Sequence, residues 1–158
     1  MEGADPRSFE FLDFVYTRDK NAVYSGGKRL TTRVKEFRVL PYPPRYATDG
    51  ERYFYGDIIL PETELEFYGP VKGSAYDYAR SKTRVYDRGR EIVGADADTF
   101  TMELVGIGIT KDKNNVYYQN RPIPNADPAS FVVVRIGLFE DKRPFYECPH
   151  DRCSERPK

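Results

Sequence analysis

The sequence predicts a mainly β protein made of about five consecutive antiparallel β-hairpin repeats with short helical turns. Two motifs recur at intervals close to thirty residues. The apolar fraction is only 39%, and 13 Tyr and 10 Phe carry much of it, which favours strands over a helical bundle. A single hairpin is marginal in water, so neighbouring repeats must bury each other's aromatic faces. Periodicity leaves open whether the hairpins form an open array or a sandwich-like fold.

The first motif opens a repeat. Residues 3–9 (GADPRSF) return as residues 94–100 (GADADTF) and as residues 125–131 (NADPASF). In the last copy, Asp127 can cap a short helical turn and Pro128 suits its first position. The motif therefore predicts a brief helical segment before the strands of a repeat.

The second motif marks a hairpin tip that contains Asp-Lys-Asn or a related sequence. It ends on an aromatic residue, and the successive spacings are 30, 32, 31 and 29 residues. The copies are residues 16–24, 46–54, 78–86, 109–117 and 138–146, and their closing aromatics are Tyr24, Phe54, Tyr86, Tyr117 and Tyr146. Asn and Asp tolerate turn geometry, so these segments are expected to reverse the chain between two strands.

The strands are expected on both sides of each tip. Residues 131–139 alternate in apolar character before the tip, and Val116 to Tyr118 follow it. Polar or glycine turns at 25–27 and 88–89 end the second strand. The repeats are expected near 3–30, 31–60, 61–92, 93–123 and 124–147, as one domain over 1–147 with a C-terminal tail over 148–158 that holds the Cys pair.

Two segments break the pattern and are the predicted binding regions. Residues 41–46 contain three prolines, and residues 61–77 contain further Pro and Gly. Irregular insertions in repeat proteins usually map to loops on one face, which often binds. The predicted partner-binding residues are of types enriched at interfaces: Tyr42, Arg45, Tyr46, Tyr68 and Tyr76. The alternative is that these tyrosines cover the core between repeats.

Residues 112–118 (DKNNVYY), followed by residues 126–131 (ADPASF), resemble the bacterial DKNYY family. The resemblance is strong over 3–30 and 93–135 and weaker over 46–92, where Ser81 and Thr83 replace the Asp and Asn of the motif. It implies the same repeat throughout and brings no catalytic residue set. Family members are often exported or envelope-associated, and some resemble immunity proteins encoded beside secreted antibacterial effectors, including lipase-type toxins.

The leading hypothesis from this resemblance is a non-catalytic immunity protein. It would neutralise a secreted, type VI-like antibacterial effector, such as a phospholipase, by covering its active cleft. The alternative is an envelope or surface repeat module that binds carbohydrate or cell wall, and a third hypothesis is an enzyme of unrecognised type. Periplasmic location is expected, with a signal peptide trimmed ahead of the motif that begins at Gly3; a cytoplasmic location is the alternative.

Composition argues against several other classes. Lys plus Arg equals Asp plus Glu at 25 each, so the chain lacks the positive field typical of nucleic-acid binding. No stretch approaches the apolar length of a membrane span. His150 is the sole histidine, and neither a nucleophile elbow nor a phosphate-binding glycine loop is present, so no enzyme activity and no cofactor are expected.

The sequence also bears on metal binding and on the state of the cysteines. The Asp-Lys-Asn-Asn tip lacks the remaining ligands of a calcium loop, so turn chemistry explains it better and no metal is expected. Cys148 and Cys153 enclose a short segment near the C-terminus. A disulfide between them is favoured over free thiols and over a metal site, and it would suit an oxidising compartment.

Overall fold

The computed structural model describes residues 3–43, 45–68, 77–104, 108–135, 138–142, 145–148 and 153–156. Backbone contacts divide the chain into two compact units, Met1–Gly69 with Asp77–Ala79 and Pro70–Tyr76 with Arg80–Lys158. Strands account for the regular structure of the described residues, which include no helix. The mainly β prediction is thereby confirmed, and among these residues no helix could cross a membrane.

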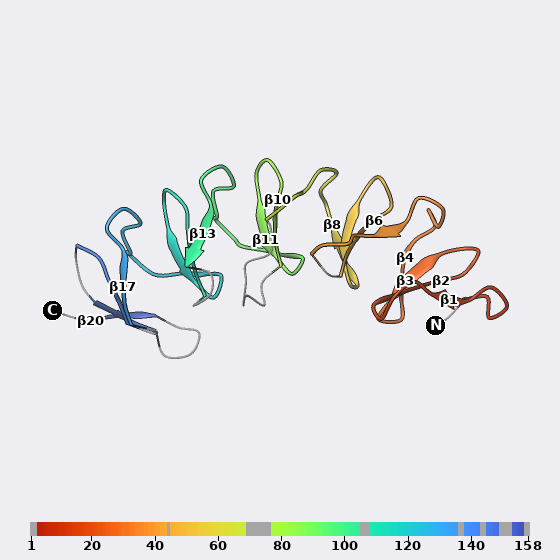
Figure 1. Cartoon of the computed structure of the whole chain (residues 1–158), viewed down its shortest axis with the longest axis horizontal. Helices are drawn as coiled ribbons and strands as arrows, with labels where there is room; N and C mark the ends of the chain where they lie inside the picture. Colours follow the sequence, from red (N-terminus) through yellow and green to blue (C-terminus); the bar gives the residue numbers. More distant parts are fainter. Residues whose placement is uncertain are drawn as a thin grey trace. The chain divides into compact units, whose positions relative to one another are not determined.

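Each repeat forms a four-stranded antiparallel sheet with its strands in chain order (Figure 1). The sheets of the first compact unit contain β1 (Glu10–Phe11), β2 (Tyr16–Arg18), β3 (Val23–Ser25) and β4 (Lys28–Thr31), then β5 (Arg38–Val39), β6 (Tyr46–Thr48), β7 (Tyr53–Tyr55) and β8 (Ile58–Leu60). The predicted hairpin corresponds to the second and third strands of each sheet. In the first sheet, for example, Thr17 of β2 lies opposite Tyr24 of β3. One further strand on each side completes the sheet.

The remaining sheets follow the same order. The third contains β9 (Glu66–Phe67), β10 (Tyr78–Arg80), β11 (Val85–Asp87) and β12 (Arg90–Glu91); the fourth contains β13 (Thr101–Leu104), β14 (Ile109–Lys111), β15 (Val116–Tyr118) and β16 (Arg121–Pro122); the fifth contains β17 (Val132–Arg135), β18 (Leu138–Glu140), β19 (Phe145–Glu147) and β20 (Ser154–Arg156). The stretch 148–158, expected to be a tail, therefore supplies the last strand of the fifth sheet. The second compact unit thus extends beyond the predicted domain end at 147.

Two-residue turns join the third and fourth strands of the first four sheets. Their backbone needs positive φ, which glycine adopts without strain, and Gly26 and Gly27 have φ of 56° and 82°. Asn tolerates the same geometry, and Asn120 has φ of 66° in the fourth sheet. The predicted glycine and polar turns at 25–27 and 88–89 are therefore confirmed as hairpin turns.

The predicted helical segments are single turns. In the last copy, the Ser130 N–H donates to the Asp127 carbonyl at 3.2 Å, which closes one turn. In the first copy, Ser8 N–H donates to Asp5 C=O at 3.3 Å. The strand that follows a few residues later takes over the backbone hydrogen bonding, so the turn does not continue into a helix.

Aromatic and aliphatic side chains from successive sheets form the cores. In the first compact unit the buried cluster is Tyr16, Val23, Leu30, Phe37, Ala47 and Phe54. In the second it is Ile109, Val116, Tyr118, Ile123, Ala126, Phe131, Phe139, Tyr146 and Cys148. Because each cluster draws on two neighbouring sheets, a single four-stranded sheet could not bury its own aromatic face.

Candidate functional site

The carboxylate at the tip of the fourth repeat is fully engaged by internal donors. Asp112 is buried, and its Oδ1 accepts hydrogen bonds from the N–H groups of Asn114 and Asn115, both at 2.7 Å. Its Oδ2 accepts from the Asp96 N–H and from the Tyr117 hydroxyl, both at 2.8 Å. One side chain thus ties together the tip, the opening turn of the repeat and the closing aromatic residue. We call this arrangement the tip network.

The first repeat contains the same tip network, and the described residues of the fifth repeat contain the half of it that involves Oδ2. Asp19 accepts from the Asp5 N–H at 2.7 Å and from the Tyr24 hydroxyl at 3.1 Å. Asp141 accepts from the Asp127 N–H at 2.6 Å and from the Tyr146 hydroxyl at 3.0 Å. The N–H of Asp5, followed by those of Asn21 and Ala22, holds the pKa of Asp19 at about 2, well below its usual range.

The motif lysine adds an exposed ion pair to each of these networks. Lys20 lies 2.7 Å from Asp5, Lys113 lies 2.8 Å from Asp96, and Lys142 lies 3.0 Å from Asp127. Lys113 lowers the pKa of the Asp96 carboxyl, and Lys20 does the same for Asp5. The Asp and Lys positions of the motif therefore both contact the opening turn of their own repeat. In the fourth and fifth repeats the closing tyrosine does so too, because the Tyr117 hydroxyl reaches the Gly94 carbonyl and the Tyr146 hydroxyl reaches the Asn125 carbonyl, both at 3.2 Å.

The two divergent repeats replace individual parts of the tip network. In the second repeat Phe54 has no hydroxyl, and the Thr31 hydroxyl donates to Asp49 at 2.8 Å instead. In the third repeat Ser81 stands at the Asp position, and its Oγ accepts from the N–H groups of Thr83 at 3.3 Å and Arg84 at 3.1 Å. A hydroxyl can close the turn in this way, but it lacks the second oxygen that reaches the opening turn.

The tip networks leave little capacity for other chemistry. Both oxygens of Asp112 already accept two hydrogen bonds each, so a cation or substrate would have to displace internal donors. Among the described residues, no group of three or more His, Cys, Asp or Glu side chains could hold a metal ion. The geometry favours the turn explanation of this motif over a calcium loop.

One of the predicted binding residues, Tyr46, belongs to the core. Its side chain is fully buried, and its hydroxyl donates to the Asp77 carbonyl at 3.2 Å. Its ring packs edge-on against Tyr55 at 4.9 Å and Phe67 at 5.0 Å between centroids. Tyr46 therefore has no surface to offer a partner, and the alternative explanation, that it covers the core, applies to this residue.

Tyr42 and Arg45 do lie at the surface, in the loop that joins β5 to β6. Tyr42 is 37% exposed, Arg45 is exposed, and the charge of Asp77 lies near both Tyr42 and Tyr55. Burial, followed by the Asp77 charge, raises the pKa of Tyr42 and of Tyr55. The Tyr55 hydroxyl also donates to the Asp77 carboxylate at 3.1 Å. This loop thus presents a tyrosine and an arginine, and the Asp77 carboxylate, which directly precedes β10, lies near Tyr42.

Tyr68, another predicted binding residue, lies between the first and second strands of the third sheet. Tyr68 is half-buried directly after β9, and its N–H donates to the Tyr78 carbonyl at 3.2 Å. Tyr76 lies outside the described residues. Both irregular segments found in the sequence thus include the loop between the first and second strands of a sheet, here called the first loop.

Sequence reasoning missed two exposed aromatic side chains of the first repeat. Phe11 at the edge of the sheet is 77% exposed, and Phe14 in the first loop is 82% exposed. Asp13 fixes this loop, because its Oδ1 accepts from the N–H groups of Val15 and Tyr16, both at 2.7 Å. The local sequence signal is Asp13, which lies between the two phenylalanines just before the first tip motif; it favours a turn but does not indicate whether either phenylalanine is exposed.

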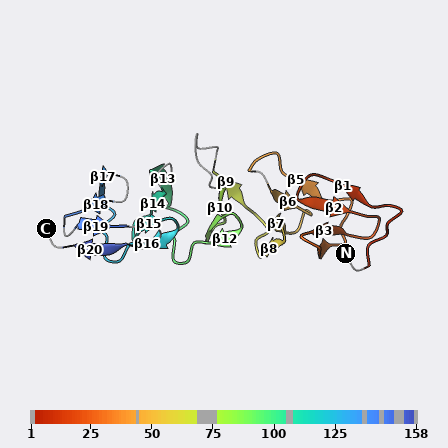
Figure 2. The ribbon, with the colours of Figure 1, turned by 90° about the horizontal axis from the view of Figure 1, so that it is seen from below.

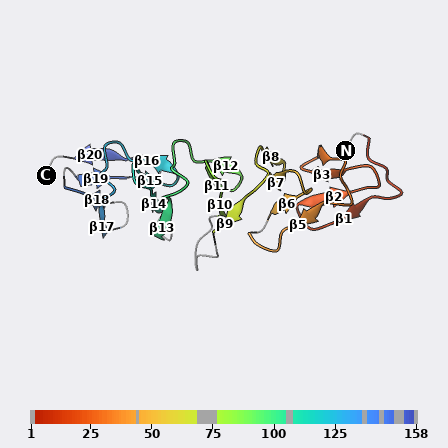
Figure 3. The same ribbon diagram turned by 90° about the horizontal axis from the view of Figure 1, so that it is seen from above.

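Exposed apolar side chains concentrate on one recurring part of the sheets. Of the six exposed large apolar side chains among the described residues, five lie on a first strand or in a first loop. These are Phe11, Phe14, Tyr42, Val132 and Val134, whereas Val93 follows β12. Figures 2 and 3 show β1 and β5 along the same side of the first compact unit. We call Phe11, Phe14, Tyr42 and Arg45 the first-loop surface.

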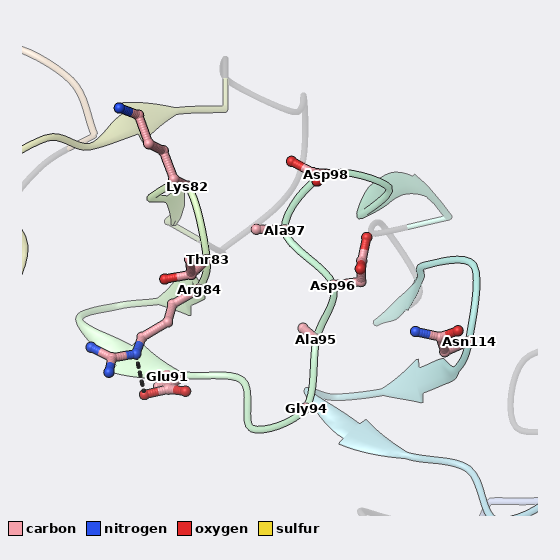
Figure 4. A pocket seen from close by; sticks show the side chains of 10 residues that line it. All are labelled: Lys82, Thr83, Arg84, Glu91, Gly94, Ala95, Asp96, Ala97, Asp98 and Asn114. Atoms are coloured by element: carbon pink, nitrogen blue, oxygen red, sulfur yellow. Dashed lines mark ion pairs between the residues drawn. The ribbon is translucent and has the colours of Figure 1, made fainter.

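An open groove of about 620 Å³ lies in the second compact unit between two hairpin tips (Figure 4). Its walls carry Lys82, Arg84, Glu91, Asp96 and Asp98, and Arg84 pairs with Glu91 at 3.6 Å. Asp96 is already engaged by Lys113 and by the Thr99 hydroxyl at 2.7 Å. The groove is polar and of mixed charge, and the Asp96 carboxylate on its wall already forms contacts within the fourth repeat.

Cys148 and Cys153 form a disulfide in the second compact unit. It joins the end of β19 to the start of β20, at the place where the other sheets have a two-residue turn. Cys148 is buried in the core cluster, and Cys153 packs against that cluster. The bridge therefore has a clear structural role in the last hairpin.

Comparison with protein families identifies the repeat. The model of the DKNYY family matches residues 1–121 and residues 78–151. The two matches together include most of both compact units. Searches of curated proteins and of solved structures found no match.

Proposed function

The chain belongs to the DKNYY family, and from this premise we propose that it is a non-catalytic inhibitor that binds a protein partner. The observation that supports this role most is the concentration of exposed apolar side chains on first strands and first loops. Large aromatic side chains exposed on an otherwise polar surface are typical of protein-binding sites. The motif carboxylates, by contrast, are engaged inside the fold.

The first-loop surface has the composition of an interface anchor. Phe11 and Phe14 offer two large apolar groups, and Tyr42 and Arg45 add residue types enriched among binding hot spots. Hydrogen bonds from backbone N–H groups to Asp13 hold the loop that carries Phe14, so little ordering entropy would be lost on binding. Such a rigid, protruding aromatic group can enter a cleft on a partner.

The proposed partner is a secreted antibacterial effector of the type VI kind, such as a phospholipase. The support is the resemblance of some family members to immunity proteins encoded beside such effectors. The inhibitor would cover the active cleft of the effector with its first-loop surface. Equal numbers of acidic and basic residues would let mixed charges orient the complex without strong non-specific attraction. Such a role would place the protein in the periplasm, where its disulfide would persist.

Co-expression with the effector encoded beside this gene tests the proposal. A stoichiometric complex that suppresses the effector's activity is expected. The double substitution Phe11→Ser and Phe14→Ser should raise the dissociation constant about tenfold or more, because it removes two apolar anchors. Val93→Ser, also at an exposed apolar position but outside the first-loop surface, is the matched control. Lack of a complex, or equal affinity of the Phe variant and the wild type, contradicts the proposal.

A second candidate is a carbohydrate- or cell-wall-binding module. It is favoured by one observation, that three of the exposed apolar side chains in the first compact unit are aromatic and could stack on sugar rings. Co-sedimentation with purified peptidoglycan tests this candidate. Retention that disappears with Phe11→Ser and Phe14→Ser supports it, and absence of retention for the wild type counts against it.

A further inference from the structure

The first strand of the fifth sheet has an open edge. β17 is the outermost strand in the order β17-β18-β19-β20, and within the described residues it pairs only with β18 (Figures 2 and 3). It is four residues long, as is β13, whereas β1, β5 and β9 have two residues each. A strand at the edge of a sheet presents backbone N–H and C=O groups that can pair with another strand.

Apart from a bulge at Val134, this edge has few of the features that usually prevent pairing. Val132 and Val134 are each 49% exposed, while Val133 packs against the core cluster. Charged side chains and proline commonly block sheet edges, yet three valines precede the first charge at Arg135. Val133 opposes Phe139 and Arg135 opposes Leu138, so Val134 is the extra residue of a bulge with no direct partner on β18.

We propose that β17 pairs antiparallel with β17 of a second copy of this chain. If Val133 lies opposite its own copy, Val132 faces Val134 at both ends of the contact, so the strand is self-complementary. Arg135 then lies opposite residue 131, away from Arg135 of the other copy. The net charge of zero adds no overall repulsion between the two chains. The two fifth sheets would join into one continuous antiparallel sheet.

Sedimentation equilibrium of the full chain tests this proposal. The wild type is expected to show a monomer–dimer equilibrium over about a hundredfold range of concentration. The double substitution Val132→Lys and Val134→Lys should raise the dissociation constant about tenfold or more, because it puts cations on the pairing edge. Val93→Lys, at a position that is 79% exposed away from β17, should leave it unchanged. A monomeric wild type, or a dimer that is insensitive to the double substitution, overturns the proposal.

Cross-linking decides the result if the lysine variant does not fold. Val132→Cys and Val134→Cys proteins, mixed under mild oxidation, are expected to form a covalent dimer faster than either protein alone. The reason is that the mixture places the two new thiols directly opposite each other, whereas the separate variants place them on a diagonal. Equal rates in all three samples overturn the proposed register. Effector binding in the first compact unit does not enter either measurement, so the two proposals stand or fall separately.

Discussion

At the scale of single residues, the tip aspartate explains the composition of the repeated motif. A carboxylate has two oxygens that can each accept two hydrogen bonds, and Asp112 uses all of this capacity. Asparagine in its place would turn an NH2 group toward two of these donors. The lysine that follows reaches the opening turn, and the aromatic residue five positions on supplies the fourth donor. The Asp, Lys and closing aromatic positions of the motif therefore each have a side-chain contact that accounts for them.

Removing this carboxylate should destabilise the second compact unit strongly. Asp112→Ala leaves three backbone N–H groups without their acceptor and leaves the Tyr117 hydroxyl with the Gly94 carbonyl alone, so we expect a loss of about 3 kcal/mol in the free energy of unfolding. Denaturant unfolding followed by near-UV circular dichroism measures it. The exposed carboxylate of Asp98 is the matched control, and Asp98→Ala should change stability by no more than about 0.5 kcal/mol. Equal effects of the two substitutions would refute the structural role.

The pH dependence of stability follows from the same carboxylates. The pKa of Asp19 falls from 3.8 to about 2 on folding, and those of Asp5 and Asp96 are also lowered. Because the folded pKa lies below the unfolded value, this stabilisation is complete above the unfolded pKa and is lost as the pH falls toward about 2. Urea midpoints measured at successive pH values should therefore decline below about pH 4. A flat profile down to pH 2 would contradict the tip networks.

The closing tyrosines make stability depend on pH in the opposite direction. Burial, followed by the carboxylate it contacts, raises the pKa of Tyr24 and of Tyr117. Since the folded pKa lies above the unfolded value, this contribution is complete below the unfolded pKa and is lost as the pH rises above about 10. Spectrophotometric titration at the tyrosinate absorption band should show at least two tyrosines that ionise only when the protein unfolds. Simple titration of all tyrosines near the usual pKa would exclude this.

At the scale of elements, a buried tyrosine connects each of the first two sheets to the next element. The Tyr16 hydroxyl donates to the Arg45 carbonyl at 2.5 Å and accepts from the Gly56 N–H at 2.9 Å. Tyr46 occupies the equivalent position in β6 and reaches the Asp77 carbonyl. Arg45 has a positive φ of 70°. In this conformation its carbonyl accepts hydrogen bonds from the Tyr16 hydroxyl and also from the Gly56 N–H, the latter at 3.2 Å. The loop conformation thus serves the junction between sheets.

Deleting this hydroxyl should weaken the junction between the first two sheets. We expect Tyr16→Phe to cost about 1–2 kcal/mol of unfolding free energy, since it removes two hydrogen bonds at a buried site. Tyr42→Phe, at an exposed tyrosine, is the control and should cost less than about 0.5 kcal/mol. Thermal unfolding of the three proteins side by side gives the comparison. A control that loses as much stability as Tyr16→Phe would argue against the junction.

The fifth sheet depends on its disulfide for the last hairpin. The bridge between Cys148 and Cys153 stands where other sheets have a two-residue turn, and it brings β20 beside β19. We expect Cys148→Ala with Cys153→Ala to lower the unfolding free energy by about 2 kcal/mol. The loss should appear as faster amide exchange in 145–147 and 154–156, with 10–31 unchanged as the internal control. Unaltered exchange in the fifth sheet would contradict this role.

Much of the element order could be predicted from sequence, for reasons visible in particular residues. The tip motif was recognisable because Asp, Asn and the closing aromatic must sit at fixed offsets to meet. Most first and fourth strands escaped prediction because short strands, such as Glu10–Phe11, carry little periodic signal. The segment 131–139, expected to be one strand, instead contains two antiparallel strands, β17 and the start of β18. Tyr46 was misassigned to the surface because a sequence does not reveal which tyrosines meet a carbonyl in the core. Phe14 was missed because nothing local distinguishes an exposed phenylalanine from a buried one.

At the scale of the whole molecule, the contacts that stabilise the fold and the surface proposed to bind a partner lie on different parts of each repeat. The tip aspartates and the closing aromatics are buried and help to hold the opening turns, whereas first strands and first loops carry five of the six exposed large apolar side chains of the described residues. Variation in the first loops can then change the partner without disturbing the tip networks. The irregular segments at 41–46 and 61–77, which break the sequence rhythm, each contribute to such a loop. Their divergence is therefore expected of a surface that determines specificity.

Amide hydrogen exchange of the isolated protein tests the central claim most directly. If the tip carboxylates are internal acceptors, the N–H groups of Asp5, Asp96 and Asp127 should exchange far more slowly than an unfolded chain, although they lie in turns outside the strands. The N–H groups of Asn114 and Asn115 should be protected with them. Exchange of these five amides at the rate of an unfolded chain, in a protein whose strands are protected, would contradict the account.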